Sequence, residues 1–384
     1  MKTHLNKFLI SEVLYYFSFW TILPFPLFGS YGLTTKDIFS LLAFYPLVVV
    51  FLEYPTGVIG DYFGHKFSSL LGVVVRFFFF LTLLYETDAV GFYYISMFLL
   101  ALASALKSGS DTAYLKSLAG DEFKSGLSNM KSYSVAAVSI SSLVGGIILL
   151  FAIKPIIYIN IATSIIIIIL LIPLPGFHNA SDRSGNIFKH SFQSFGYLKA
   201  LPYIGLLIAL VGVTQGYLFS IKTLLNSLET ITESNIFLIS IAIGVSTFVR
   251  IVGFKLSVLL PKLKEYTVIL SAIFVTVISA LLNIPLLFIG VLLLHNIFFG
   301  IVEHRYEYKL SEGAPKAHRA SLLSLASLVK RGTTALYLWF AGYILGIYSF
   351  AAMLYLTIIL FGVILLGSLV VMTNFNSKAL IHND

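Results

Sequence analysis

The sequence predicts an all-helical membrane protein with twelve transmembrane helices in two halves of six. Of its 384 residues, 58% are hydrophobic and 11% are charged, whereas soluble domains carry about 25% charged residues. Apolar runs of about 20 residues, the length that crosses a bilayer as a helix, recur along the chain. One long polar interval near the middle, 176–201, separates the runs into two sets. Membrane lipid is therefore the expected surrounding of most of the surface.

Each predicted span is an apolar run bounded by charged residues, glycine or proline. The first run begins at Phe8, contains Glu12 and reaches about Gly29, which suits a retained helix better than a cleaved signal. The predicted spans are 8–29, 38–60, 66–85, 91–115, 130–152, 154–174, 202–224, 235–258, 266–283, 285–306, 320–345 and 349–372. The predicted domains are an N-terminal half (1–175), a cytoplasmic linker (176–201) and a C-terminal half (202–384).

Lysine and arginine are concentrated in alternate loops, which predicts the orientation of the chain. One set of loops contains only Lys36 and Lys154, while the termini, the linker and the remaining loops hold the other basic loop residues. Because positive loops stay in the cytoplasm, we expect both termini there, in a multi-pass protein of the plasma (inner) membrane. The formal net charge of +8 is explained by these loops, and we expect no nucleic-acid partner.

The stretch E-Y-P-T-G-V-I-G-D-Y-F-G-H-K, from Glu53 to Lys66, lies between the second and third predicted spans. We expect Asp61 to end one helix, Gly64 to permit the reversal, and His65 to open the next helix. Glycines in such a turn let neighbouring backbone approach closely. The sequence therefore predicts a short, charged turn whose shape is tightly constrained.

This turn resembles the signature loop of the major facilitator superfamily, G-x-x-x-D-x-x-G-[RH]-[KR]. The matched residues are Gly57, Asp61, Gly64, His65 and Lys66. The preceding E-Y-P-T is similar to the E-x-P-T-G start of bacterial drug-efflux-like members. The segment S-G-S-D-T-A at 108–113 and the segment R-A-S-L-L-S-L from 319 also resemble that branch. The resemblance departs from the pattern at Tyr62 and His65, where arginine is usual.

The resemblance implies a twelve-helix fold that works by alternating access between two halves. It implies that the matched loop residues act as a conformational latch on the cytoplasmic side. It also implies that the first, fourth, seventh and tenth spans line a central cavity.

Charged residues inside spans are costly, at about 2.5–3.5 kcal/mol each on insertion scales, and so need a reason. Glu12 and Asp111 lie on the first and fourth spans, where a carboxylate removed from water can exchange a proton near neutral pH. We predict that one of them couples transport to protons, with Glu303 as the next candidate. Lys107 and Asp111 are four residues apart and can share a helix face.

The candidate substrate contacts are Arg76, Lys107, Tyr16, Gln215, Tyr217, His295 and Asn296. Each polar one could instead make an interhelical hydrogen bond, and the bases could simply neutralise neighbouring acids. Among the charged residues inside the predicted spans we consider six bases, Arg76, Lys107, Lys222, Arg250, Lys330 and Arg331, and four acids, Glu12, Glu53, Asp111 and Glu303. This surplus predicts a substrate with a negative or zwitterionic group, held chiefly by Lys107 and Arg76.

The predicted function is proton-driven export of a small organic molecule, as in an antiporter. The fifth span lacks the Gly-Pro of the superfamily's G-P-x-x-G-G antiporter element and keeps only Gly145 and Gly146. One alternative is therefore a proton-coupled importer of an organic anion, and another is a transport-inactive receptor or scaffold. The chain has no cysteine and no phosphate-binding glycine loop ending in Lys-Ser or Lys-Thr. We expect no enzyme activity, cofactor or metal, and a monomer.

Overall fold

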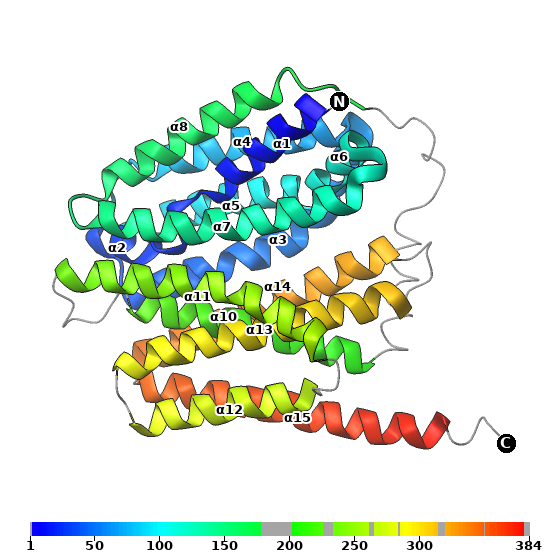
Figure 1. The fold of residues 1–384 in the computed structure, drawn as a ribbon. Helices are drawn as coiled ribbons and strands as arrows, with labels where there is room; N and C mark the ends of the chain where they lie inside the picture. The colour runs from blue at the N-terminus through cyan, green and yellow to red at the C-terminus, as the bar shows by residue number, and fades with distance from the viewer. Residues whose placement is uncertain are drawn as a thin grey trace. The chain divides into compact units, whose positions relative to one another are not determined.

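The computed structural model describes residues 2–177, 202–225, 233–260, 265–282, 285–313, 319–348 and 350–379. These residues form helices and connecting turns, with no strand among them (Figure 1). In chain order the elements are α1 (Lys2–Tyr16), the short 3₁₀ helix η1 (Phe19–Thr21), α2 (Pro24–Ser30), α3 (Thr35–Phe63), α4 (His65–Thr82), α5 (Val90–Lys107), α6 (Ser110–Ala119), the 3₁₀ helix η2 (Gly120–Glu122), α7 (Phe123–Leu149), α8 (Lys154–Leu171), α10 (Pro202–Leu225), α11 (Glu233–Leu259), α12 (Glu265–Leu282), α13 (Pro285–Gly313), α14 (Arg319–Ile347) and α15 (Phe350–Ala379).

The all-helical prediction is confirmed, and each predicted span overlaps one helix or a run of consecutive helices. Within the described residues, six helices are long and apolar enough to cross a membrane, or seven if the bent pair α1–α2 counts as one span. The total of twelve spans and the division into halves at 1–175 and 202–384 stay predictions. Most of the predicted linker, residues 178–201, lies outside the described residues.

The chain divides into two compact units, which are described separately. The first unit comprises Met1–Asp182 and Lys222–Phe248, and the second comprises Arg183–Ile221 and Val249–Asp384.

Two predicted spans are interrupted in the first unit, where the sequence had predicted continuous helices. The span at 8–29 contains α1, η1 and α2, and its two main parts meet at 51°. Pro24 supplies the reason, since proline lacks an amide donor and favours the first turn of a new helix. The span at 91–115 breaks between α5 and α6, where Gly109 has a φ of 78°. Glycine adopts this left-handed conformation without the steric cost that other residues incur.

The expected turn after α3 begins later than predicted. Asp61 does not end α3, which continues to Phe63, and Gly64 alone separates it from α4. Gly64 has a φ of 94°, so the chain reverses at the one residue that tolerates this conformation. Asp61 therefore lies in the last turn of α3, and its side chain lies outside the described residues.

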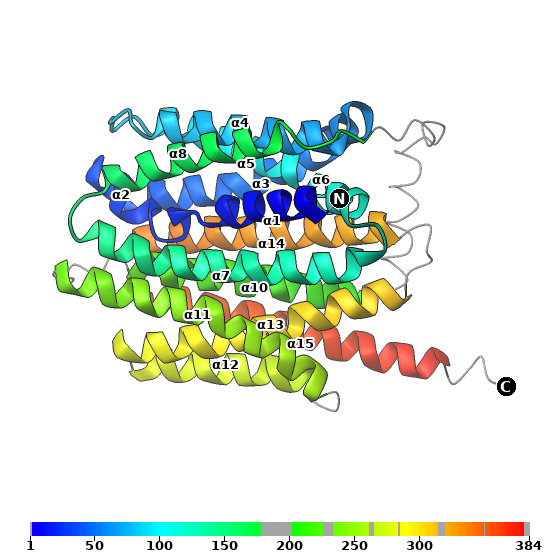
Figure 2. The same ribbon diagram turned by 45° about the horizontal axis from the view of Figure 1, so that its top comes forward.

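Helix α4 packs against both α5 and α8 in the first unit (Figures 1 and 2). Gly72 makes close packing of α4 on α5 possible, because a Cβ atom there would lie 2.9 Å from the backbone oxygen of Ala103. Close backbone approach through small residues is typical of helix pairs in membranes. This contact brings α4 within reach of the carboxyl end of α5, where the charged residues of the site lie.

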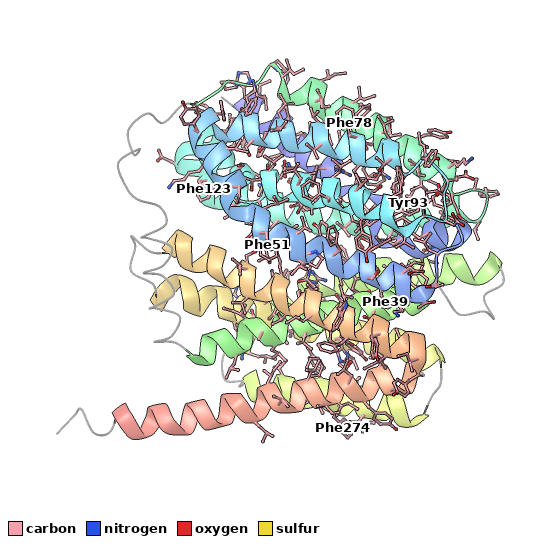
Figure 3. All side chains as sticks on the ribbon, turned by 180° about the vertical axis from the view of Figure 1, so that it is seen from behind. Phe39, Phe51, Phe78, Tyr93, Phe123 and Phe274 are labelled. Carbon is pink, nitrogen blue, oxygen red and sulfur yellow. The ribbon has the colours of Figure 1, made fainter. Side chains whose placement is uncertain are left out.

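The large apolar side chains divide between interior and exterior in each unit. Phe39 and Tyr93 are buried in the first unit, whereas Phe78 on α4 is 51% exposed and Phe274 on α12 of the second unit is 64% exposed (Figure 3). Phenylalanine at such exposure suits a surface in contact with lipid tails. In the second unit, α12 packs on α13 and α15, and α14 packs on the same two helices.

We predict that Gly72→Val lowers the thermal unfolding midpoint of the detergent-purified protein. The added side chain must push the backbone of Ala103 away, and overpacking of this kind costs about 1–3 kcal/mol. Gly91→Val is the matched control, because a Cβ atom at Gly91 meets nothing within 4 Å. Equal midpoints for the two variants would contradict the proposed close approach of α4 and α5.

Candidate functional site

A cluster of charged side chains lies buried in the first unit. Lys107, the last residue of α5, donates from Nζ to Glu12 Oε1 at 2.6 Å and to Asp111 Oδ1 at 3.0 Å. The three side chains belong to residues that are only 1% (Glu12), 3% (Lys107) and 7% (Asp111) exposed. The structure thus places one buried lysine between two buried carboxylates.

Local structure explains how three elements deliver these groups to one place. Lys107 ends α5 and Asp111 stands in the first turn of α6, just after the break at Gly109. The amino end of a helix favours an acidic side chain, and Ser69 on α4 donates to Asp111 Oδ1 at 2.7 Å. The prediction that Lys107 and Asp111 share one helix face is wrong, because the two residues belong to different helices, but their side chains are in contact.

Arg76 on α4 adds a second buried base to this cluster. Its Nη1 donates to the backbone oxygen of Tyr15 at 2.7 Å, and its Cζ lies 4.2 Å from the centre of the Tyr15 ring. Lys107 Nζ lies 4.3 Å from the centre of the same ring. A cation over an aromatic face is attracted by the ring's quadrupole, so the Tyr15 ring partly stabilises both bases.

The cluster is balanced in charge when all its groups are ionised. Glu12 and Asp111 contribute two negative charges, and Lys107 and Arg76 contribute two positive charges. Removing ions from water costs several kcal/mol each, and good pairing is needed to offset it. The surplus of positive charge counted over all predicted spans does not lie in this cluster, where Lys107 is paired with Glu12 and Asp111.

The signature loop makes specific contacts with the rest of the first unit. Lys66 donates from Nζ to the backbone oxygens of Ile172, at 2.7 Å, and Leu174. These carbonyls follow α8, so Lys66 interacts with the negative end of that helix. Gly60 packs closely against α6, since a Cβ atom there would lie 2.9 Å from Ser110 Oγ. The loop thus contacts both α6 and the end of α8.

The positions of two other predicted loop residues, Gly57 and His65, follow from the course of the backbone. Gly57 lies within α3 and a Cβ atom there would meet nothing within 4 Å, so the expected close approach occurs at Gly60 and not at Gly57. His65 opens α4 as predicted. The role of these residues as a latch stays a proposal.

Glu303 and its neighbours form a separate group in the second unit. Glu303 Oε1 accepts from Lys330 Nζ at 3.2 Å. Arg250 Nη2 donates to Asn296 Oδ1 at 3.2 Å, and its Cζ lies 4.4 Å from the centre of the Phe299 ring. Asn296 also donates to the backbone oxygen of Leu292. Asn296 is thus fully engaged in helix packing, which is the structural alternative that the sequence had left open.

Two of the candidate substrate contacts, Tyr217 on α10 and His295 on α13, also make contacts between helices. His295 is fully buried, and its ring nitrogens lie 3.0 Å from Thr276 Oγ1 and 2.9 Å from the backbone oxygen of Val291. Its ring centre is 4.8 Å from that of Tyr217, which is buried as well. Gln215 instead lies exposed on α10.

Four of the predicted residues, Glu12, Arg76, Lys107 and Asp111, come together in one cluster. Tyr16, a candidate substrate contact, does not join them; it is 37% exposed and packs edge-on against Tyr15. Tyr15 and Ser69 complete the cluster and were missed as site residues. Tyr15 follows Glu12 by three residues and so shares its helix face, which was an available signal. Ser69 carries no sequence signal that separates it from its neighbours.

Comparison with known proteins identifies relatives of the whole chain. The family model described as Major Facilitator Superfamily matches residues 8–329. No curated protein sequence matches the chain. Among solved structures, the nucleoside transporter NupG has a TM-score of 0.77 at 15% identity, over 96% of this chain and 98% of that one.

Two further solved structures have similar folds. The POT family transporter PepTSo has a TM-score of 0.74 at 14% identity, over 99% of both chains. A D-xylose-proton symporter has a TM-score of 0.70 at 12% identity, over 95% of both chains. At these identities the likeness is one of fold.

We predict that Lys107→Met destabilises the protein more at about pH 8 than at about pH 5. Removing one member of a buried charge network costs about 3–5 kcal/mol, because uncompensated charge remains. Here two carboxylates remain, and protonation at the lower pH relieves their repulsion. The measurement is the thermal unfolding midpoint at both pH values.

Lys154→Met is the control for this prediction. Lys154 pairs with Glu86 at 2.7 Å, but the two side chains are 58% and 51% exposed. Exposed pairs contribute about 0–1 kcal/mol, so a small change at both pH values is expected. If Lys107→Met lowers the unfolding midpoint equally at both pH values, the carboxylates of Glu12 and Asp111 do not depend on Lys107 for neutralisation.

Proposed function

Because this chain belongs to the Major Facilitator Superfamily, we propose that it is a proton-coupled secondary transporter of a small organic molecule. The single observation that carries this proposal is Lys107 held between Glu12 and Asp111 in the interior of the first unit. Secondary transporters work by alternating access, in which a central site opens to one side of the membrane at a time. A buried titratable group that changes charge between these states is what proton coupling requires.

The two acids and one lysine provide such a group. A proton bound by either acid leaves Lys107 paired with the other acid. Protonation changes the net charge of the four-residue cluster from zero to plus one. In a low-dielectric interior, one unit of charge alters the relative stability of conformations strongly.

We propose export as the direction of transport, in exchange for protons. The resemblance of residues 53–57 and 108–113 to drug-efflux-like members supports it. The second candidate is uptake together with protons. The missing Gly-Pro before Gly145 and Gly146 favours it, and so does the name of one structural neighbour, a D-xylose-proton symporter. Both directions use the same buried acids.

We also propose that the protein lies in the plasma (inner) membrane with both termini in the cytoplasm. The distribution of lysine and arginine among the loops supports this orientation. In this orientation the α3–α4 turn faces the cytoplasm, where a conformational latch formed by Gly57, Asp61, Gly64, His65 and Lys66 would act. The contact of Lys66 with the end of α8 supports a role of the loop in holding helices together.

We predict that Glu12→Gln or Asp111→Asn abolishes flux driven by a pH gradient but leaves counterflow exchange when the probe is supplied at a saturating concentration. Each substitution keeps the shape of the side chain and removes the group that takes up a proton. The full chain is reconstituted in vesicles with an imposed pH gradient. Labelled uridine, D-xylose, dialanine, phenylalanine and tetraphenylphosphonium are the probes.

The sign of the response gives the direction. Protons are made to flow into the compartment that corresponds to the cytoplasm. If a probe then leaves that compartment, the protein exchanges it for protons. If the probe accumulates there together with protons, the protein takes it up with protons. Glu86→Gln, which alters an exposed acid of the same unit, is the control and should respond as the unaltered protein does. If both interior variants respond normally to the gradient, proton coupling through this cluster is excluded.

For the latch, we predict that Asp61→Asn lowers flux at least about tenfold while the protein still inserts and binds ligand. The reason is that ligand binding and the conformational change are separate steps, and the latch acts on the second. Asp61 lies in the last turn of α3, three residues before the reversal at Gly64. Insertion is checked by yield and unfolding midpoint, and binding by ligand-induced stabilisation. Near-normal flux would reduce Asp61 to a residue that shapes the turn.

A further inference from the structure

Two polar atoms in the buried cluster have no hydrogen-bond partner among the residues that the structure describes. They are Glu12 Oε2 and Arg76 Nη2, on residues that are 1% and 2% exposed. Leaving a buried polar atom unsatisfied costs free energy, more so for a charged group. Such atoms are uncommon in native proteins and usually have a functional explanation.

The other carboxylate oxygen of Glu12 and the other terminal nitrogen of Arg76 are already engaged. Lys107 Nζ is shared by Glu12 Oε1 and Asp111 Oδ1, which also accepts from Ser69. Arg76 Nη1 is used by the backbone oxygen of Tyr15. The cluster therefore offers one free acceptor on a carboxylate and one free donor on a guanidinium.

These two groups belong to the same electrostatic site. Arg76 lies against the Tyr15 ring, and the same ring contacts Lys107, the lysine that binds Glu12. A ligand that contacts both free atoms would thus lie beside an aromatic side chain.

The balance of charge restricts what this ligand is. The four ionised groups sum to zero, so a bound anion or cation would leave one uncompensated charge in a low-dielectric interior. A ligand with one negative and one positive group adds no net charge. It also satisfies the free donor and the free acceptor at once.

We propose that Arg76 and Glu12 bind the two charged ends of a small zwitterion, with its carboxylate on Arg76 and its ammonium group on Glu12. The inference rests on the proposed transport function and names the substrate class of the same cluster. Arginine is well suited to the first role, because its planar guanidinium binds carboxylates through parallel hydrogen bonds. Lys107 keeps Glu12 and Asp111 in place and does not itself bind the ligand.

This assignment makes the proton and the ligand competitors for Glu12 Oε2. A protonated Glu12 no longer attracts an ammonium group, so a proton that arrives there promotes release. The charged and titratable groups that act on Glu12 are Lys107 on α5, Asp111 on α6 and Arg76 on α4, together with the neighbouring Tyr16 on α1. Competition of this kind produces exchange, which is the direction proposed above.

The test compares matched ligands on the full-length purified protein. Phenylalanine carries both charged groups, 3-phenylpropanoate lacks the amine and 2-phenylethylamine lacks the carboxylate. β-Alanine, 4-aminobutanoate and dialanine vary the separation of the two charges. The readouts are ligand-induced thermal stabilisation and the dissociation constant by calorimetry.

We expect at least one of the zwitterions to stabilise the protein, and neither single-charge analogue to do so. Arg76→Gln and Glu12→Gln should each weaken its binding at least about tenfold, as expected for the loss of a charge-assisted hydrogen bond. Lys154→Gln and Glu86→Gln, which alter the exposed pair of the same unit, should bind as the unaltered protein does. If Arg76→Gln does not fold, Arg76→Lys is used, because it keeps the charge and loses the planar donor pair.

The proposal is overturned if no zwitterion of the set binds, if a single-charge analogue binds as tightly, or if the two interior variants bind normally. These results are distinct from a failure of the proposed function. Proton-driven flux of another probe without zwitterion binding rejects only the ligand assignment. Zwitterion binding without any response to a pH gradient rejects only the proton coupling.

Discussion

The first unit depends on the way Lys107 is neutralised in an apolar interior. A lysine at this depth is tolerated only because Glu12 and Asp111 both contact its ammonium group. That requirement fixes the relative positions of α1, α5 and α6, since each contributes one of the three charges. Ser69 on α4 contacts Asp111, so the fourth helix is tied to the same point. The group that is most costly to bury is thereby also the one that organises the surrounding helices.

Glycine determines how closely the helices around this cluster approach. Gly72 lets α4 meet the backbone of α5, and Gly109 lets the chain break so that Asp111 starts a new helix. A continuous helix would also have placed Lys107 and Asp111 on one face. The break instead places Asp111 in the first turn of α6, where the helix end favours a negative charge. The carboxylate of Asp111 therefore has an ion pair with Lys107, a hydrogen bond from Ser69 and a position at a helix terminus.

The signature loop and the charged cluster are parts of one packed structure. Gly60 contacts Ser110 at the start of α6, and the next residue of that helix is Asp111. Lys66 contacts the end of α8, which itself packs on α1 and α4. A change of charge at Glu12 or Asp111 thus acts on helices that the loop also contacts. This continuity gives a physical route by which protonation and the conformation of the loop could be linked.

The helical class, the approximate spans and the identity of the charged residues could all be predicted from the sequence. These follow from local composition, because a bilayer requires long apolar helices and makes every internal charge conspicuous. Glu12, Asp111, Lys107 and Arg76 were all recognised from the sequence for this reason. Their roles as a balanced cluster were not, because pairing depends on distances between helices.

Which charges are neutralised and which atoms remain free depends on how the helices pack. The packing pairs Lys107 with two acids and brings the Tyr15 ring against two bases, and within the described part of the chain it leaves Glu12 Oε2 and Arg76 Nη2 without partners. It also engages His295 and Asn296 in hydrogen bonds of the second unit. Sequence periodicity specifies the face of a helix on which a residue lies. It does not specify which helix covers that face, and the balance of charge in the interior depends on that choice.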